Sequence, residues 1–395
     1  MRSTRLLTLV GALFFVGVGL TSPAMTLYLE DLGASFRQIS LILTSFTLTA
    51  LISNYASGYL SDRLGRRKPL LVGGLLLMGV AYVWLARVPT ANLAWPVRIL
   101  EGIGTGAYAT LSLAMMGDLL QHSTRRGRGM GLFRGVGSFS FAMGAFAGSW
   151  VGARYATPAI FMLAAAFFVA AALIALLVSE VRPETSAATF AEKTPAAALP
   201  VEGPAQLPRP FLAGVVLWTT AVAATVSMWP NAMSHLGYSN QAISALWGLA
   251  ALVEFPGMQG AGILSVSIGR APLLAAGAWG IALTIVGWIF LAKWLVPLIG
   301  VQIVRGLAYG SYMASAMTFA AEHASQATRG SVSGVFTAAS SAGQLAGVLA
   351  GGFIVEALGF NALFVICAVV SAISGVLFWG LRRTHVQQRH YASMP

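Results

Sequence analysis

The sequence predicts an all-α membrane protein in which twelve transmembrane helices form two pseudo-symmetric six-helix bundles. Three observations predict this fold class: an apolar composition, apolar runs of membrane-spanning length, and a repeat of one half of the chain in the other. Of the 395 residues, 57% are hydrophobic and 9% are charged, and the mean hydropathy is +0.77. A soluble protein carries about a quarter of its residues as charged side chains. The chain therefore has too few charges to cover a surface that faces water.

The apolar runs are about twenty residues long, the length that a helix needs to cross the hydrocarbon core. Helices are predicted because lipid offers a bare backbone amide no hydrogen-bond partner. The first run follows basic residues as a signal peptide does, but it is too long and lacks a small-residue cleavage site, so we expect it to remain. The predicted spans are 7–29, 38–60, 69–87, 94–118, 129–152, 158–179, 211–235, 240–264, 271–293, 297–320, 330–352 and 360–381.

The net charge of +12 is distributed unevenly between the two ends of these spans. With the N-terminus in the cytoplasm, 17 of the 24 Lys and Arg residues fall on the cytoplasmic side and three inside spans. The four on the other side are Arg37, Arg87, Arg154 and Lys293. This is the positive-inside bias of membrane proteins, so the charge indicates topology and not nucleic-acid binding. It predicts an integral plasma-membrane protein, in a bacterial inner membrane, with both termini cytoplasmic.

The two halves of the chain share a sequence repeat with a step of 204 residues. Gly58 recurs as Gly262 and Gly65-Arg66 as Gly269-Arg270, while Asp118 falls on Glu322. Residues 181–210 lack a long apolar run and are rich in Ala and Pro, which is typical of a linker. The predicted domains are an N-terminal bundle, 1–180, a cytoplasmic linker, 181–210, and a C-terminal bundle with a cytoplasmic tail, 211–395. Repeats of this kind place a transport site at their interface near the bilayer midplane.

The loop after the second predicted span carries a dense motif of glycines and charges, Gly58-Tyr-Leu-Ser-Asp62-Arg63-Leu-Gly65-Arg66-Arg-Lys. Gly58 would allow two helices to approach, and Gly65 would allow a tight turn. Asp62 can accept hydrogen bonds from the N-terminus of a neighbouring helix. A loop that only sets topology would explain the cations but not this spacing.

The loop motif resembles the signature of the major facilitator superfamily, and the resemblance covers the whole chain. It implies that Asp62 latches to the start of the span near Gly330 and that Arg66 pairs with Asp118. The predicted conformational latch comprises Gly58, Asp62, Arg63, Gly65, Arg66 and Asp118. In the second copy Val266 and Ser267 replace Asp62 and Arg63, so the equivalent latch is not expected there. The resemblance is strongest to the 12-helix drug:proton antiporter branch.

Two further segments bear on that branch. Arg98, followed by Gly102, Gly104 and Gly106, is similar to the family's second signature, whose Arg is linked to proton coupling. The antiporter signature in the span 129–152 would be Gly-Pro-x-x-Gly-Gly, whereas this chain has Gly144-Ala-Phe-Ala-Gly148-Ser. The missing Pro removes the best marker of an antiporter.

Ionisable side chains inside predicted spans are expensive to bury and are therefore candidate functional residues. Arg98 and Glu101 lie on one face of the span 94–118, and the repeat places Arg305 at the position of Glu101. Glu254 lies two residues before Pro256, where a helix is loosened. We predict that Glu254, Arg305, Arg98 and Glu101 couple transport to protons. The alternative is that Arg98–Glu101 and Glu254–Arg305 are static pairs that hold helices together.

Further polar and aromatic residues recur at helical spacing on the faces that would surround a shared, water-filled cavity. The predicted lining of the substrate cavity is Tyr108, Thr105, Tyr309, Tyr312, Gln302, Gln344, Asn54, Thr47, Trp229 and Asn231.

The leading functional hypothesis is a proton-coupled secondary transporter that exports amphiphilic or lipophilic small molecules by alternating access. A symporter or facilitator for sugars or other small metabolites is the alternative within the same class. A lipid flippase or a non-transporting receptor on the same fold are alternatives from other classes. The expected partners are a small-molecule substrate, protons and membrane lipid, and the protein is expected to be a monomer that binds no nucleic acid.

An enzyme is not expected. The sequence has no pair of His residues at metal-ligand spacing, no nucleophile elbow and no phosphate-binding loop. Its single cysteine, Cys367, excludes an intrachain disulfide and a cysteine-based metal cluster. No cofactor and no metal ion are predicted.

Overall fold

The computed structural model of the chain describes residues 2–121, 126–179, 207–324 and 329–392. The described residues are almost entirely helical and contain no β-strand, which confirms the predicted all-α class. Eight helical segments among them are long and apolar enough to cross a membrane. The number of twelve spans stays a prediction. The predicted linker lies almost wholly outside the described residues.

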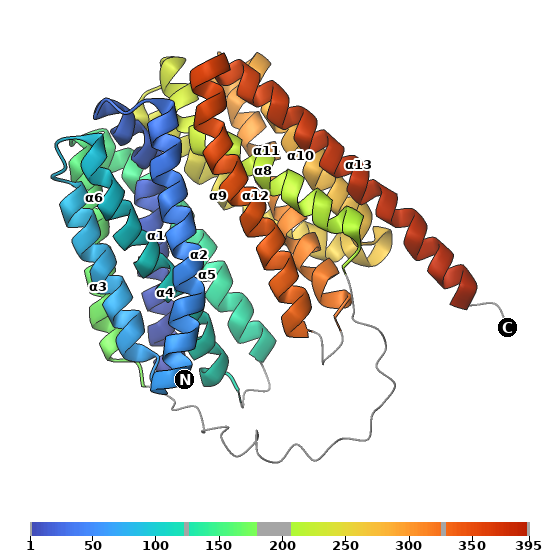
Figure 1. Cartoon of the computed structure of the whole chain (residues 1–395), viewed down its shortest axis with the longest axis horizontal. Coiled ribbons are helices and arrows are strands. Elements are labelled where there is room, and N and C mark those ends of the chain that lie inside the picture. The colour runs from blue at the N-terminus through green and yellow to red at the C-terminus, as the bar shows by residue number, and fades with distance from the viewer. Residues whose placement is uncertain (1, 122–125, 180–206, 325–328, 393–395) are drawn as a thin grey trace. The chain divides into compact units, whose positions relative to one another are not determined.

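The long helices agree closely with the predicted spans (Figure 1). Most extend several residues beyond the apolar run, since polar residues at the membrane surface continue the same hydrogen-bonded backbone. In the first half of the chain the helices are α1 (Arg2–Asp31), α2 (Phe36–Leu64), α3 (Lys68–Leu85), the short 3₁₀-helix η1 (Ala91–Leu93), α4 (Ala94–Leu119), α5 (Arg126–Gly152) and α6 (Thr157–Leu176). In the second half they are α8 (Arg209–His235), α9 (Asn240–Ile268), α10 (Arg270–Leu291), α11 (Leu295–Glu322), α12 (Arg329–Leu358) and α13 (Phe360–Ala392).

Glycines in the left-handed backbone region end several of these helices. Gly33 and Gly65 have φ angles of 82° and 61°, and Gly237 and Gly269 have 91° and 83°. Each of the second pair lies 204 residues after its counterpart, and only glycine adopts such angles without strain. The tight turn predicted at Gly65 is therefore present, and it recurs in the second copy of the loop.

The chain divides into two compact units, which we describe separately. Unit 1 comprises Met1–Ala34, Ile42–Val201 and Asn240–Gly248, and unit 2 comprises Ser35–Leu41, Glu202–Ser239 and Leu249–Pro395. The first turns of α2 thus belong to unit 2, and the first turns of α9 belong to unit 1. The predicted boundaries at 180 and 211 treat each half as unbroken and stay a prediction.

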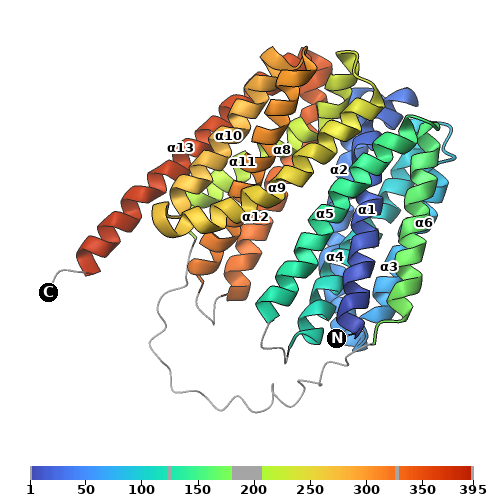
Figure 2. The same ribbon diagram turned by 180° about the vertical axis from the view of Figure 1, so that it is seen from behind.

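Helices pack in the same order inside both units. In unit 1, α1 packs against α5 and α6, while α3 packs against α4 and α6. In unit 2, α8 packs against α12 and α13, while α10 packs against α11 and α13. The pairs α3–α6 and α10–α13 lie side by side in both views (Figures 1 and 2). The repeat seen in the sequence is therefore a repeat of helix packing.

Glycines create the same close approaches in the two units. A Cβ atom on Gly106 of α4 would lie closer than 3.0 Å to the backbone of Ala50 and Asn54 on α2. A Cβ atom on Gly310 of α11 would lie closer than 3.0 Å to the backbone of Glu254 and Met258 on α9. All three positions differ by 204. At these sites the backbones of two helices are in direct contact, which small residues permit in membrane proteins.

We predict that Gly106→Val destabilises the protein by about 1–3 kcal/mol, because its side chain would overlap the backbone of α2. Gly117→Val on the same helix is the matched control, since a Cβ atom at Gly117 would meet no atom within 4 Å. The measurement is the thermal unfolding midpoint of each purified variant in detergent. Equal midpoints for the two variants would contradict the direct backbone contact.

Candidate functional site

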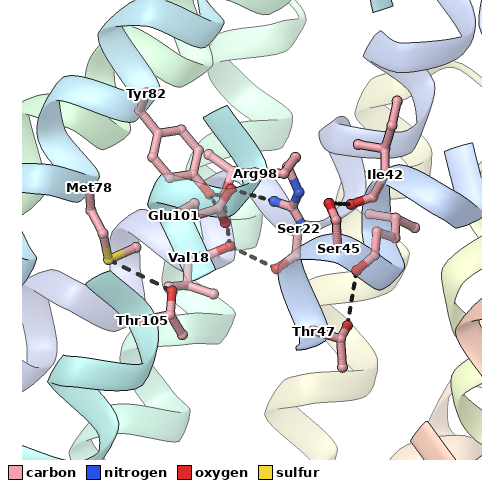
Figure 3. Close-up of polar contacts among 12 residues, drawn as sticks. Val18, Ser22, Ile42, Ser45, Thr47, Met78, Tyr82, Arg98, Glu101 and Thr105 are labelled. Atoms are coloured by element: carbon pink, nitrogen blue, oxygen red, sulfur yellow. Dashed lines mark hydrogen bonds and ion pairs between the residues drawn. The ribbon is translucent and has the colours of Figure 1, made fainter. Parts of the chain in front are cut away.

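A buried ion pair lies in the first two turns of α4 in unit 1 (Figure 3). Arg98 and Glu101 lie one turn apart on α4, each is 5% exposed, and the Arg98 guanidinium donates to Oε2 of Glu101. The Tyr82 hydroxyl on α3 donates to the other oxygen, Oε1, at 2.6 Å. The Thr21 hydroxyl on α1 lies 3.1 Å from the Tyr82 oxygen. Both carboxylate oxygens of Glu101 are therefore engaged, as burial of a charge requires.

The Arg98 guanidinium has a second neighbour. Its central carbon lies 4.2 Å from the centre of the Phe46 ring on α2, a cation–π contact. Its Nε is buried and has no hydrogen-bond partner among the described residues. The cluster of Arg98, Glu101, Tyr82, Thr21 and Phe46 thus joins four helices of unit 1. Neither Tyr82 nor Phe46 was among the predicted site residues, because each reads as an ordinary aromatic residue in an apolar run.

A second charged cluster lies in unit 2. Glu254 on α9 is half-buried, Arg305 on α11 is 7% exposed, and the two charges interact electrostatically. Tyr309 lies one turn further along α11 than Arg305. The backbone contact at Gly310 holds Glu254 against α11. The two charges therefore influence each other within unit 2, and a direct pairing of Glu254 with Arg305 stays a prediction.

Aromatic and amide side chains pack beside this cluster inside unit 2. The Trp288 indole N–H on α10 donates to Oε1 of Gln302 at 3.2 Å. Gln302, Trp229 and Asn231 are each 0% exposed, and the Trp229 and Trp288 rings lie 5.9 Å apart. These three predicted cavity residues thus lie in the interior of unit 2 rather than on an open surface.

Two predicted cavity tyrosines form stacked pairs instead. Tyr108 stacks on Phe14 with ring centres 3.5 Å apart, and Tyr312 stacks on Trp218 at the same distance. Tyr108 is 3% exposed and Tyr312 is 1% exposed. The step of 204 relates both members of the two pairs. The structure therefore corrects the predicted placement of Tyr108 and Tyr312 on the wall of a cavity. Both rings pack in the interior of their units, because the helix face that looks polar in sequence also packs against α1 or α8.

The other predicted cavity residues are more accessible. Asn54 accepts a hydrogen bond from the Thr110 hydroxyl at 3.2 Å, and the Thr47 hydroxyl donates to its own helix at Leu43. The Thr105 hydroxyl points to the Met78 sulfur, 3.8 Å away (Figure 3). The half-buried members are Thr47, Asn54, Thr105 and Tyr309, and the exposed member is Gln344.

In the loop motif, the acid at the end of α4 pairs with a different arginine from the one predicted. Asp118 forms an ion pair with Arg67, whereas Arg66 is exposed, as is Arg63. Arg67 is the N-cap of α3, so its side chain starts beside the end of α4. Asp62 lies 4.0 Å from the same guanidinium, with 75% of its side chain exposed. The motif alone does not show which of the two adjacent arginines faces α4, because this depends on the backbone direction of the turn between α2 and α3.

Gly58 differs from its predicted role in the same motif. A Cβ atom there would make an ordinary contact, at 3.5 Å, with the Thr110 side chain. The helices do not touch through their backbones at this position in the structure.

The second copy of the loop keeps the ion pair. Arg270 donates to one oxygen of Glu322 from Nε at 3.1 Å and from Nη2 at 3.0 Å. The acids Asp118 and Glu322 are related by the step of 204. The pairing of an arginine beside the loop with the acid at the end of α4 or α11 thus recurs, although Asp62 itself has no counterpart.

A family model described as Major Facilitator Superfamily matches residues 7–296 and 212–393, which together cover nearly the whole chain. The chain belongs to the major facilitator superfamily. This agrees with the predicted fold class and with the loop motif, and it makes the protein an integral membrane transporter. The transport proteins of this family are not enzymes.

Relatives in the superfamily are distant. The chain is 26% identical over 404 residues to the "Putative sugar efflux transporter" of Deinococcus radiodurans, covering 95% of this chain and 97% of the relative. It is 25% identical over 132 residues to the "Quinolone resistance protein NorA" of Staphylococcus aureus, covering 33% of this chain and 34% of the relative.

Solved structures agree with the fold. The nucleoside transporter NupG superposes with a TM-score of 0.77 at 16% identity, covering 96% of this chain and 99% of the other. A bacterial homologue of the lysosomal transporter Spinster superposes with a TM-score of 0.76 at 14% identity, with 97% of both chains covered. At this identity the likeness concerns the fold alone.

We predict that Arg67→Gln lowers the unfolding midpoint whereas Arg66→Gln does not, because only Arg67 pairs with Asp118. The pair is partly buried, with side chains 17% and 24% exposed. A double-mutant cycle with Asp118→Asn should give a coupling energy of about 0.5–1 kcal/mol for Arg67 and none for Arg66. Coupling to Arg66 instead would restore the assignment made from the motif.

Proposed function

We propose that this member of the superfamily is a proton-coupled exporter of amphiphilic or lipophilic small molecules that works by alternating access. The observation that carries the proposal is Glu254, a half-buried carboxylate on α9 that interacts electrostatically with the buried Arg305 on α11. A carboxylate in hydrocarbon is expensive unless it is paired, so its charge state and its partner are linked. Arg98 and Glu101 supply a second charged pair in unit 1.

In this mechanism the protonation state of Glu254 decides whether the side chain is attracted to Arg305. As a carboxylate it is attracted to Arg305, and as a neutral acid it loses that attraction. Substrate and proton then compete for the same site, so that one leaves as the other binds. Pro256, two residues later, removes one backbone hydrogen bond of α9 and lets the helix yield at this point. The half-buried Tyr309, Thr105, Thr47 and Asn54 and the exposed Gln344 are the proposed substrate contacts.

The rest of the proposal concerns the membrane. The distribution of 17 against 4 basic residues supports a bacterial inner membrane with both termini in the cytoplasm. The NorA relative, a quinolone resistance protein, supports export of lipophilic compounds.

A second candidate substrate is a sugar. The relative that matches this chain over 404 residues is named as a sugar efflux transporter. The buried amides of Gln302 and Asn231 are groups that bind hydroxyls, and the indole rings of Trp288 and Trp229 are groups that stack on sugar rings. An opening of unit 2 would be needed to expose them.

We predict that Glu254→Gln abolishes transport driven by an imposed pH gradient in proteoliposomes, a loss of at least tenfold, and leaves the unfolding midpoint within a few degrees of wild type. The amide keeps the shape of the side chain but cannot exchange a proton. Asp31→Asn, at the exposed end of α1, is the control and should transport normally.

The same proteoliposomes separate the substrates. A cationic dye and a labelled sugar are loaded in parallel, and the proposal expects gradient-driven efflux of the dye. Efflux of the sugar alone would select the second candidate. Unchanged proton-driven flux in Glu254→Gln would remove Glu254 as the coupling residue.

Asp62 is proposed to act as the conformational latch. Its exposed carboxylate can bind the N-terminus of α12, which begins at Arg329. We predict that Asp62→Asn slows turnover several-fold and changes the reactivity of cysteines introduced on the cytoplasmic side, without altering substrate affinity. Asp31→Asn, which removes an exposed carboxylate outside the loop motif, is the control. Wild-type turnover and labelling in Asp62→Asn would contradict the latch.

A further inference from the structure

An apolar groove lies between α10 and α11 in unit 2, apart from the charged cluster of Glu254 and Arg305. Its volume is about 550 Å³. Leu283 and Phe290 of α10 form one wall, and Pro297 and Val304 of α11 form the other. The groove opens at Gly300, where a Cβ atom would meet nothing within 4 Å. Gly300 therefore contributes no side chain to the lining of the groove.

The chemistry of the lining restricts the occupant to hydrocarbon. Leu283 and Phe290 are 62% and 67% exposed, which in a membrane transporter means contact with lipid. The only hydroxyl in the lining belongs to Thr284, and it donates to the Gly280 carbonyl of its own helix at 2.8 Å. A sugar or another polar solute would therefore lose its hydrogen bonds to water without replacing them.

One end of the groove carries a positive charge. Leu291, the last residue of α10, and Pro297, in the first turn of α11, both line the groove. The connection between them contains Lys293 and Trp294, which are exposed. Tryptophan and lysine at the end of a membrane helix mark the level of the lipid head groups. A cation therefore lies where the phosphate of a lipid would be if its chain lay in the groove.

The length of the groove matches one leaflet. From Leu283 to Leu291 the helix rises about 12 Å, and one leaflet contributes roughly 15 Å of hydrocarbon. The groove thus runs from the head-group level most of the way to the bilayer midplane, as a single acyl chain does.

Unit 1 offers a natural comparison. The step of 204 places Pro96 at the position of Gly300 and Pro89 at the position of Lys293. Unit 1 therefore has a side chain at the position of Gly300, and the cation of its α3–α4 connection, Arg87, lies two residues before the position of Lys293. The groove is a feature of unit 2 and not a consequence of the repeated helix packing.

We propose that this groove binds one phospholipid molecule, with an acyl chain between α10 and α11 and the phosphate on Lys293. The bound lipid fills the space that Gly300 leaves and holds the two helices together. The site does not depend on which solute the protein transports.

The test is lipid binding to the purified full-length protein in detergent, measured by native mass spectrometry. The probes are phosphatidylglycerol and a diacylglycerol with the same chains, which lacks the phosphate. We expect wild type to retain one phosphatidylglycerol at least tenfold more tightly than further copies. Gly300→Leu should abolish this first binding event, and Lys293→Gln should weaken it about tenfold, to the level of diacylglycerol.

Two controls keep the test sharp. Gly117→Leu adds the same side chain at an open position of α4, and Arg87→Gln removes a cation from the α3–α4 connection; both should bind lipid as wild type does. Unfolding midpoints without lipid show whether Gly300→Leu folds, and Gly300→Ala, which fills less of the groove, should bind with intermediate affinity.

Wild-type retention of the lipid in Gly300→Leu would overturn the site. Equal binding of diacylglycerol to wild type would overturn the role of Lys293, and loss of binding in Gly117→Leu would show a non-specific effect.

Discussion

The direct contact between glycine backbones of neighbouring helices is the constraint on which the rest of this structure depends. Gly106 of α4 lies against α2, and Gly310 of α11 lies against α9 at the position 204 residues later. In α5 and α12, Gly144 and Gly347 make the same approach to α1 and α8. Lipid tails are as apolar as the helices, so burial of apolar surface does not drive association inside a membrane, and close packing has to do so. Once these backbones touch, the side chains one turn away have fixed neighbours, and the charged residues of α4 and α11 are among them.

The repeat therefore conserves packing while it varies chemistry. Glu101 and Arg305 occupy equivalent positions and carry opposite charges. Glu101 forms an ion pair with Arg98 on its own helix, whereas Arg305 interacts electrostatically with Glu254 on a neighbouring helix. A pair within one helix moves as a rigid body with that helix. A pair between two helices changes whenever those helices shift, which makes the arrangement in unit 2 the more sensitive to conformation.

Much of the fold and part of the site could be predicted from the sequence, for identifiable reasons. Apolar runs and the step of 204 determine the helices and their packing order, because both depend on residue type at long and regular spacing. Which loop arginine pairs with Asp118 could not be predicted. Arg66 and Arg67 are chemically identical, and only the backbone of the turn before Lys68 sets the direction of each side chain. Tyr108 and Tyr312 follow the same periodicity as cavity residues, and only the position of α1 and α8 shows that Phe14 and Trp218 cover them. Tyr82 gave no signal at all, because the polar contact of its hydroxyl is made with another helix.

The two carboxylates inside the membrane helices differ in a way that bears on coupling. Glu101 is 5% exposed, and donors from Arg98 and Tyr82 occupy both of its oxygens, so adding a proton would cost two charge-assisted hydrogen bonds in a site that water does not reach. Glu254 is half-buried, its cation lies on a neighbouring helix, and Pro256 loosens α9 two residues later. A side chain that carries protons needs contact with water and an ion-pair partner from which it can separate. It also needs a helix backbone that can move when the pair separates. Glu254 fits these conditions better than Glu101 does, so the pair in unit 1 is better suited to hold α3 and α4 together, and Glu254 is the residue that we propose to exchange a proton.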